Sequence, residues 1–171
     1  MPGDYAAIRR IHEQTFGRLD EAFLVETLRK EQGFLPDLSL VAVKNNIIVG
    51  HVLFFPVTIV TPEGKEETSL ALASASVYPD FQRQGIGGKL IREGLSIAVR
   101  RQYRSVAVCG HADFYLRFGF RKASDFGIKS PFACSDETFL IRELQPQSLS
   151  ALTGIVRYPS PFHRIVPRKI S

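Results

Sequence analysis

A glycine-rich turn that opens an amphipathic helix is the part of the sequence best suited to chemistry. Gly85, Gly87 and Gly88 leave the backbone N–H groups around them unshielded by side chains. The first turn of a helix has unpaired N–H donors and a partial positive charge. These features together bind a phosphate or pyrophosphate, and Arg83 adds a charge-assisted hydrogen bond. The segment therefore predicts an anion site.

Three phosphate-binding patterns compete for this segment. The sequence does not match the P-loop pattern, because Leu90 stands where that pattern needs Ser or Thr. The dinucleotide fingerprint fails because the same Leu90 replaces its third glycine. The pattern Gln/Arg-x-x-Gly-x-Gly/Ala fits, as Gln82-x-x-Gly85-x-Gly87.

The fitting pattern resembles the signature of the GCN5-related N-acetyltransferases (GNAT), in which this loop binds the pyrophosphate of coenzyme A. The family's second motif, Tyr-x-x-x-Gly-Phe after a strand, matches Tyr115–Phe120 after Ser105–Cys109. A narrower resemblance is to YhbS-like predicted acetyltransferases, and it covers nearly the whole chain. It is carried by Tyr115–Phe120 together with Leu38–Ala42, Val49–Phe54, Ser130–Phe132 and Gly154–Pro159.

The resemblance implies a mixed α/β (α+β) fold, with a central, mostly antiparallel twisted sheet and helices on both faces. Acetyl-CoA is then the co-substrate, held at the splayed strands before and after the signature helix, and no metal takes part. The reaction is transfer of an acetyl group to a primary amine by direct attack. The cofactor-binding residues that the resemblance implies are Ala75, Ser76, Val77, Gln82, Arg83, Gln84, Gly85, Ile86, Gly87, Gly88, Lys89 and Tyr115.

Tyr115 resembles the family tyrosine that acts as general acid toward the coenzyme A sulfur. The alternative is a core aromatic among Phe114, Phe118 and Phe120. The oxyanion donor implied by the resemblance is a backbone N–H of the strand at 75–77, where the pantetheine arm pairs as an added strand does.

The sequence does not single out a general base. The strand Leu70–Val77 has no carboxylate, so His51 and His111 are the candidates, because imidazole accepts a proton near neutral pH. A structural role for each histidine and a water chain to bulk solvent are the alternatives. Cys109 and His111 are spaced as a Cys–His nucleophile pair on a strand, but we expect Cys109 to be a small buried residue.

The missing carboxylate keeps a second function class open. A non-catalytic acyl-CoA-binding sensor or subunit needs the anion site but no base. The expected acetyl acceptor is a small-molecule or peptide amine, and a homodimer is one of the assemblies consistent with the sequence.

Composition favours one globular domain over residues 1–171. The chain is 44% hydrophobic and has a net charge of +5. The stretch from Leu144 to the end, which includes a Pro- and Ser-containing extension at 145–171, has no acid and four bases: Arg157, Arg164, Arg168 and Lys169. We expect a solvated tail there, with a docking site for an acidic partner as the alternative, and no nucleic-acid platform.

The same sequence predicts a cytoplasmic protein that does not enter a membrane. No apolar run is long enough to span a bilayer, and the first four residues do not begin a signal peptide. The two cysteines, Cys109 and Cys134, lack a spacing that indicates a disulfide framework or a zinc site.

Hydrophobic periodicity predicts the elements that position these residues. Two helices are expected at 4–16 and 20–32, with Asp20 as an N-cap and Phe16 and Phe23 facing inward. Asn45-Asn46 indicates a turn, and Pro56 indicates an edge or bulge in the strand around it. The remaining strands are expected at 38–43, 47–60, 69–77, 105–109 and 137–144, and the remaining helices at 85–102 and 113–118.

Overall fold

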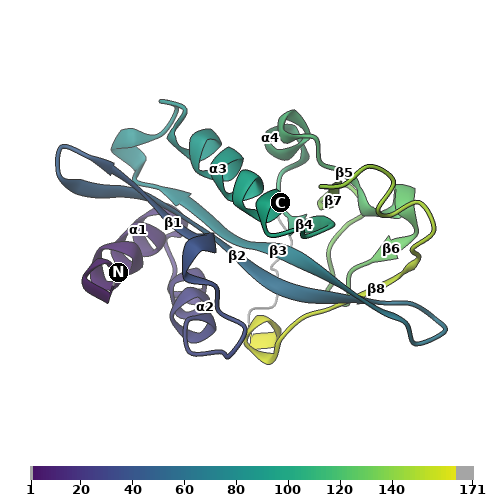
Figure 1. Ribbon diagram of the computed structural model, residues 1–171. Coiled ribbons are helices and arrows are strands. Elements are labelled where there is room, and N and C mark those ends of the chain that lie inside the picture. The colour runs from purple at the N-terminus through teal and green to yellow at the C-terminus, as the bar shows by residue number, and fades with distance from the viewer. Residues whose placement is uncertain (1, 165–171) are drawn as a thin grey trace. The chain divides into compact units, whose positions relative to one another are not determined.

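The computed structural model describes residues 2–164 (Figure 1). The chain divides into two compact units. The first unit is Met1–Phe55 with Ala73–Ile97, and the second is Pro56–Leu72 with Ala98–Ser171. Two long strands, β2 (Ile47–Val60) and β3 (Glu66–Val77), run through both units.

A mixed sheet joins the strands in the order β5-β7-β4-β3-β2-β8-β6, with β1 paired to β2. The β3–β4 and β6–β8 pairs are parallel, whereas β1–β2, β2–β8, β4–β7 and β5–β7 are antiparallel. The expectation of a mixed, mostly antiparallel sheet is confirmed. The shorter strands are β1 (Ser39–Lys44), β4 (Ser105–Cys109), β5 (Arg121–Lys122), β6 (Ile128–Lys129), β7 (Phe139–Glu143) and β8 (Gly154–Arg157).

In the first unit, helices cover both faces of the sheet. Helices α1 (Tyr5–Phe16) and α2 (Asp20–Leu28) lie on one face, and α3 (Ile86–Arg100) lies on the other (Figure 1). Neighbouring residues of β2 show the alternation, since Gly50 faces Ile86 and Leu90 of α3 while His51 contacts His12 of α1.

The predicted helices exist, but some of their predicted inward residues are wrong. Phe16 and Phe23 are 37% and 48% exposed, and His12 is fully buried instead. Phe16 lies at the C-terminal end of α1 and stacks on the His12 ring from outside. Helix α2 ends at Leu28 rather than Gln32, and Asp20 is its first residue rather than a capping side chain.

Turn and proline positions follow local chemistry. Asn45 and Asn46 have φ values of 50° and 61°, which a tight hairpin turn requires, so the predicted turn is confirmed. Pro56 lies between Leu53, the last β2 residue paired with β1, and Thr58, the first paired with β8. The missing N–H of proline therefore falls where that side of β2 changes partner.

The sequence prediction missed β5, β6 and β8. Strands of two to four residues are too short for a period of two to be seen. Strand β8 lies inside the segment expected to be an extension, and its Arg157 pairs with Glu66 at 2.8 Å. Arg168 and Lys169 lie outside the described residues.

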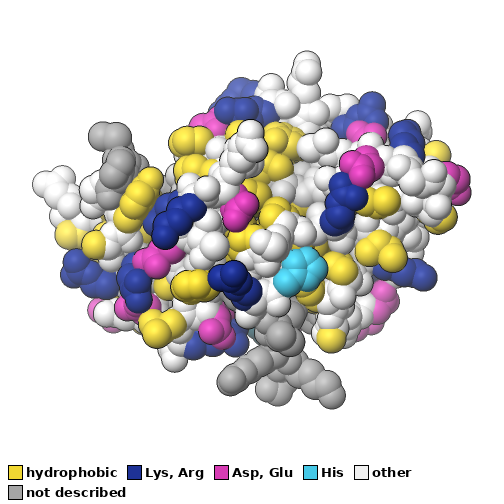
Figure 2. Space-filling model, turned by 90° about the horizontal axis from the view of Figure 1, so that it is seen from below, with side chains coloured by type: hydrophobic (Ala, Val, Ile, Leu, Met, Phe, Trp, Pro, Cys, Tyr) yellow, Lys and Arg dark blue, Asp and Glu magenta, His cyan; other side chains and the backbone are white. Residues whose placement is uncertain are grey.

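Charged side chains of both signs are interspersed with apolar ones on the face shown in Figure 2. Within the first unit Arg9 bonds to both Glu13 and Glu26, and within the second Arg104 bonds to Glu67. Over residues 2–164 no helix has the length and apolar character needed to cross a membrane.

Helix α3 packs on the sheet through a close helix–strand contact. A Cβ built on Gly94 would lie 2.1 Å from Cε2 of Phe54, a fully buried ring of β2. Only glycine allows this approach, because the ring has no free space into which to move.

Helix α1 packs on the opposite face of the sheet through a buried pair of histidines. Nε2 of His12 lies 2.9 Å from Nδ1 of His51, and both side chains are fully buried. Burial, and second the charge of Arg29, lowers the pKa of His12 to about 4. Burial, then His12 and Arg29, lowers the pKa of His51 well below its usual value. Both rings are therefore neutral in the folded protein near neutral pH.

The first prediction concerns the Gly94 contact. Gly94→Ala should lower the free energy of unfolding by about 1–3 kcal/mol, because the added methyl group overpacks against Phe54 despite the better helix propensity of alanine. Urea denaturation measures this. Val99→Ala is the control on the same helix, where an exposed side chain should change stability by less than about 0.5 kcal/mol. An unchanged or higher stability of Gly94→Ala would contradict the contact.

The second prediction concerns the pH dependence of stability. Because the pKa values of His12 and His51 are lower in the folded than in the unfolded chain, the unfolded chain binds protons first as pH falls. The stabilisation is complete above about pH 6.5 and is lost below it, at up to about 1.4 kcal/mol per pH unit for each histidine. Between about pH 7 and pH 5, the free energy of unfolding measured by denaturation should depend less steeply on pH in the double variant His12→Gln/His51→Gln than in wild type. Equal slopes would exclude the pair as the cause.

Candidate functional site

The predicted anion loop leads into α3 through left-handed backbone. After the 3₁₀ turn Pro79–Phe81, Arg83 has φ 58° and Gly85 has φ 79°. The side chain of Gln82 donates to the carbonyl of Val77 at 3.0 Å, and that of Gln84 donates to the carbonyl of Asp80 at 3.2 Å. The two glutamines therefore fix the loop to its own backbone.

The start of α3 presents free backbone donors. The N–H of Lys89 bonds to the carbonyl of Gly85 at 3.0 Å. The N–H groups of Ile86, Gly87 and Gly88 precede this bond and lie in the first turn of α3, where helix N–H groups have no intrahelical acceptor. The structure thus places the predicted loop residues around a helix N-terminus that attracts an anion.

A cavity of about 490 Å³ lies beside this loop within the first unit. Lys44 reaches from β1 to the loop, where its Nζ donates to Oε1 of Gln84 at 2.7 Å and lies 5.5 Å from the centre of the Phe81 ring. The cavity lining is aliphatic with charged residues among it: Leu40, Val41, Ala42, Val43, Lys44, Val49, Gln84, Ile86, Lys89, Leu90 and Glu93.

The last residues of β3 are fixed from both sides in the first unit. The hydroxyl of Thr15 donates to the carbonyl of Val77 at 3.1 Å, and the N–H of Tyr78 donates to the carbonyl of Val49 at 2.9 Å. Ala75 and Val77 are half-buried, whereas Ser76 points to the opposite face and is 4% exposed. The β3–β4 ladder comprises Leu70 and Ala71, opposite Val106 and Ala107.

Tyr115 lies in the second unit, at the end of the short helix α4 (Ala112–Tyr115). A Cβ on Gly110 would lie 2.5 Å from Cε2 of Tyr115, so the ring packs directly on the backbone of Gly110. Phe114 and Phe120 flank the ring edge-on, with centroids 5.0 and 5.6 Å away. Burial raises the pKa of Tyr115 to about 12, so its hydroxyl keeps its proton at neutral pH.

The two candidate bases lie in different units. His111 is exposed and precedes α4, four residues before Tyr115. His51 is in the first unit, buried against His12. Sequence reasoning missed His12, although its position four residues after Ile8 and next to Ile11 places it on the buried face of α1.

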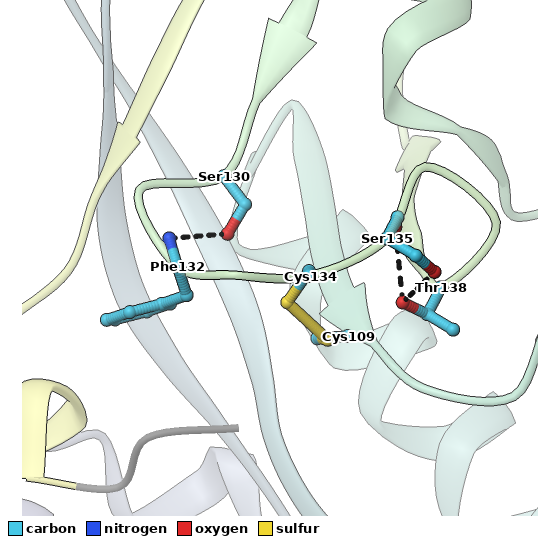
Figure 3. The surroundings of a disulfide bond; sticks show 6 residues. All are labelled: Cys109, Ser130, Phe132, Cys134, Ser135 and Thr138. Atoms are coloured by element: carbon cyan, nitrogen blue, oxygen red, sulfur yellow. Dashed lines mark hydrogen bonds between the residues drawn. A yellow bond between two sulfur atoms is a disulfide. The ribbon is translucent and has the colours of Figure 1, made fainter. Parts of the chain in front are cut away.

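Cys109 and Cys134 form a disulfide, and the expectations of no disulfide and of a small buried Cys109 are wrong (Figure 3). Cys109 is exposed at the end of β4, and its Cα lies 6.7 Å from that of Cys134. The antiparallel pairing of Cys109 with Phe139 on β7 brings the two together across 25 residues of sequence, a distance that carries no spacing signal. The disulfide also excludes Cys109 as a nucleophile partner of His111.

The loop around Cys134 is held by its own serines. The N–H of Phe132 donates to Oγ of Ser130 at 3.0 Å, and the hydroxyls of Ser135 and Thr138 lie 2.9 Å apart (Figure 3). Among residues 2–164 no group of three or more His, Cys, Asp or Glu side chains is arranged to hold a metal ion.

Comparisons with known proteins agree with this geometry. The model of the acetyltransferase (GNAT) domain matches residues 2–123. The uncharacterized N-acetyltransferase YjhQ of Escherichia coli is 35% identical over 164 residues, 92% of this chain and 88% of that protein.

Two solved structures extend the similarity to the fold. The GNAT family N-acetyltransferase YhbS of Escherichia coli, in complex with CoA, has a TM-score of 0.88 at 30% identity, over 96% of this chain and 89% of that one. A GNAT family acetyltransferase of Brucella melitensis, in complex with acetyl-CoA, has a TM-score of 0.76 at 32% identity, over 95% and 94% of the two chains. The GNAT fold expected from the two motifs is confirmed, and the chain belongs to the GNAT family of acetyltransferases.

Proposed function

We propose that the protein transfers an acetyl group from acetyl-CoA to a primary amine of a small molecule or peptide. The observation that carries the proposal is the loop at 82–85, which presents the free N–H groups of a fifteen-residue helix to an anion. The CoA and acetyl-CoA named for the two similar structures supply an anion of this kind, a pyrophosphate.

Acetyl-CoA binds through backbone groups in this proposal. The pyrophosphate accepts hydrogen bonds from the N–H groups at 85–88, with the charges of Arg83 and Lys89 beside it. The pantetheine arm lies along β3 at Ala75–Val77, past the last recorded pair with β4 at Ala71. A backbone N–H of the same stretch donates to the oxyanion that forms on the thioester carbonyl.

Tyr115 protonates the departing sulfur. A neutral phenol is a competent donor, and the raised pKa keeps Tyr115 neutral over the physiological range. For the base, His111 and His51 are both retained. His111 is near Tyr115 in sequence and open to solvent, whereas His51 acts only through the buried side chains bonded to it.

A non-catalytic acyl-CoA sensor is the second candidate function. The observation in its favour is β3, whose residues 70–77 include no carboxylate. A sensor keeps the pyrophosphate site and needs no proton acceptor. Incubating the purified protein with acetyl-CoA and a panel of primary amines decides between them, because only an enzyme releases free CoA in an amine-dependent way.

The third prediction concerns Tyr115. Tyr115→Phe should lower kcat about 10- to 100-fold, the modest end of general acid catalysis, because a thiol of pKa near 8.5 is already a fair leaving group. Acetyl-CoA affinity, measured by calorimetry, should stay the same. Tyr158→Phe, which changes a buried tyrosine elsewhere in the second unit, is the control with unchanged kcat. An unchanged kcat in Tyr115→Phe would remove the tyrosine from the mechanism.

The fourth prediction concerns the packing of the Tyr115 ring on Gly110. Gly110→Ala puts a methyl group where the ring now lies, so the ring must shift and its hydroxyl must move with it. We expect kcat to fall about 10-fold or more, as in Tyr115→Phe, with no further loss in the double variant. If the fold losses in kcat of the two single variants multiply in the double variant, Gly110 does not act through Tyr115.

A further inference from the structure

A chain of four polar side chains crosses the core of the first unit. Nε2 of His51 lies 2.9 Å from Oγ of Ser39, and Nδ1 of His51 lies 2.9 Å from Nε2 of His12. Nδ1 of His12 lies 3.2 Å from Oγ of Ser74. The four residues come from β1, β2, α1 and β3, and every ring nitrogen has a partner.

This chain can hold an extra proton without losing a hydrogen bond. Two neutral imidazoles carry one N–H each, so the neutral pair points its donors in one direction along the chain. One added proton gives three N–H groups, which donate from His12 to Ser74, from His12 to His51 and from His51 to Ser39. All three bonds of the neutral chain therefore persist, because each hydroxyl oxygen can accept as well as donate.

Ser76 lies on β3 next to the Ser74 end of this chain. It lies two residues beyond Ser74 on the same face of the strand and is 4% exposed. Its Oγ has no hydrogen-bond partner within the described residues, which is uncommon for a buried hydroxyl. The Cα atoms of residues i and i+2 of a strand are about 7 Å apart. Hydroxyl groups on the same face that lean toward each other come within reach of one bridging water, whose two hydrogen bonds together span about 5 Å.

We propose that Ser76 contacts the acceptor amine and that Ser74, His12 and His51 take up the proton which the amine loses. This rests on the proposed acetyl transfer, in which the 75–77 stretch of β3 holds the thioester. Ser76 is then a catalytic residue, whereas His12 and His51 act through Ser74 and are positioning residues that hold the proton.

The proton balance closes over one turnover. The amine nitrogen forms its bond to the thioester carbon, and its proton passes to Ser76, whose own proton moves through the bridging water to Ser74. Ser74 passes its proton to Nδ1 of His12. The carbon–sulfur bond then breaks, and the thiolate takes the proton of Tyr115. After the products leave, the histidine pair returns its proton to water by the same route, and Tyr115 regains one from solvent.

The surroundings of the histidine pair favour release of a bound proton. Arg29, at the end of α2, acts on both rings and disfavours their protonation, as does burial. The pair therefore holds the proton only transiently and is empty again at neutral pH before the next turnover.

The fifth prediction tests this route with acetyl-CoA and the most active amine of a primary-amine panel. Ser76→Ala removes a hydroxyl that has no bond to lose within the described chain, so its stability should match wild type while kcat falls about 10- to 100-fold at unchanged KM for acetyl-CoA. In His12→Gln, which cannot be protonated, kcat should fall as far and then rise with pH as hydroxide replaces the missing acceptor.

Ser69→Ala is the matched control on β3, since its hydroxyl bonds to Ser105 and should leave kcat unchanged. Suppose that the wild type is active, that the kcat of Ser76→Ala is within twofold of the wild-type value, and that kcat has the same pH profile in His12→Gln as in wild type. That result would overturn the proton route but not the acetyl transfer. A wild type that releases no CoA with any amine would overturn the acetyl transfer and the route together. Should His12→Gln fail to fold, Ser76→Ala decides by itself.

Discussion

Alternation along buried strands is the constraint on which the first unit depends. Successive residues of β2 and β3 face opposite sides, and in the first unit helices cover both sides (Figure 1). Gly50 gives α3 the room to approach one face, while His51 meets His12 on the other. The same rule separates Ala75 and Val77 from Ser74 and Ser76. One short stretch of β3 can thus serve the acetyl donor through its backbone and a polar chain through its serines.

The loop before α3 was predictable because its chemistry is local. Glycines, a helix start and a spacing of six residues identify an anion site without any knowledge of the rest of the fold, and the structure gives Arg83 and Gly85 the left-handed backbone that such a loop needs. The long strands were predictable for the same reason, because runs of β-branched and aromatic residues such as Ile47–Val60 favour strands over helices. The roles of the site residues stay predictions.

What the sequence could not provide comes from contacts between distant segments. His12 is unremarkable within α1, and it gains its role only from His51 and Ser74, thirty-nine and sixty-two residues away. The exposed Phe16 shows the converse, an apolar residue that periodicity assigns to the core although the helix ends there. Cys109 and Cys134 meet because β4 pairs with β7, a register that no cysteine spacing encodes.

The disulfide makes a covalent ring of the segment that carries Tyr115. Cys109 and Cys134 close a loop that contains Gly110, α4 and the Tyr115–Phe120 motif. The ring limits how far this segment can spread in the unfolded chain, which lowers the entropy gained on unfolding. It also means that a protease cut anywhere between the two cysteines leaves the fragments tethered, so the second unit keeps its parts in one molecule even when its backbone is broken there.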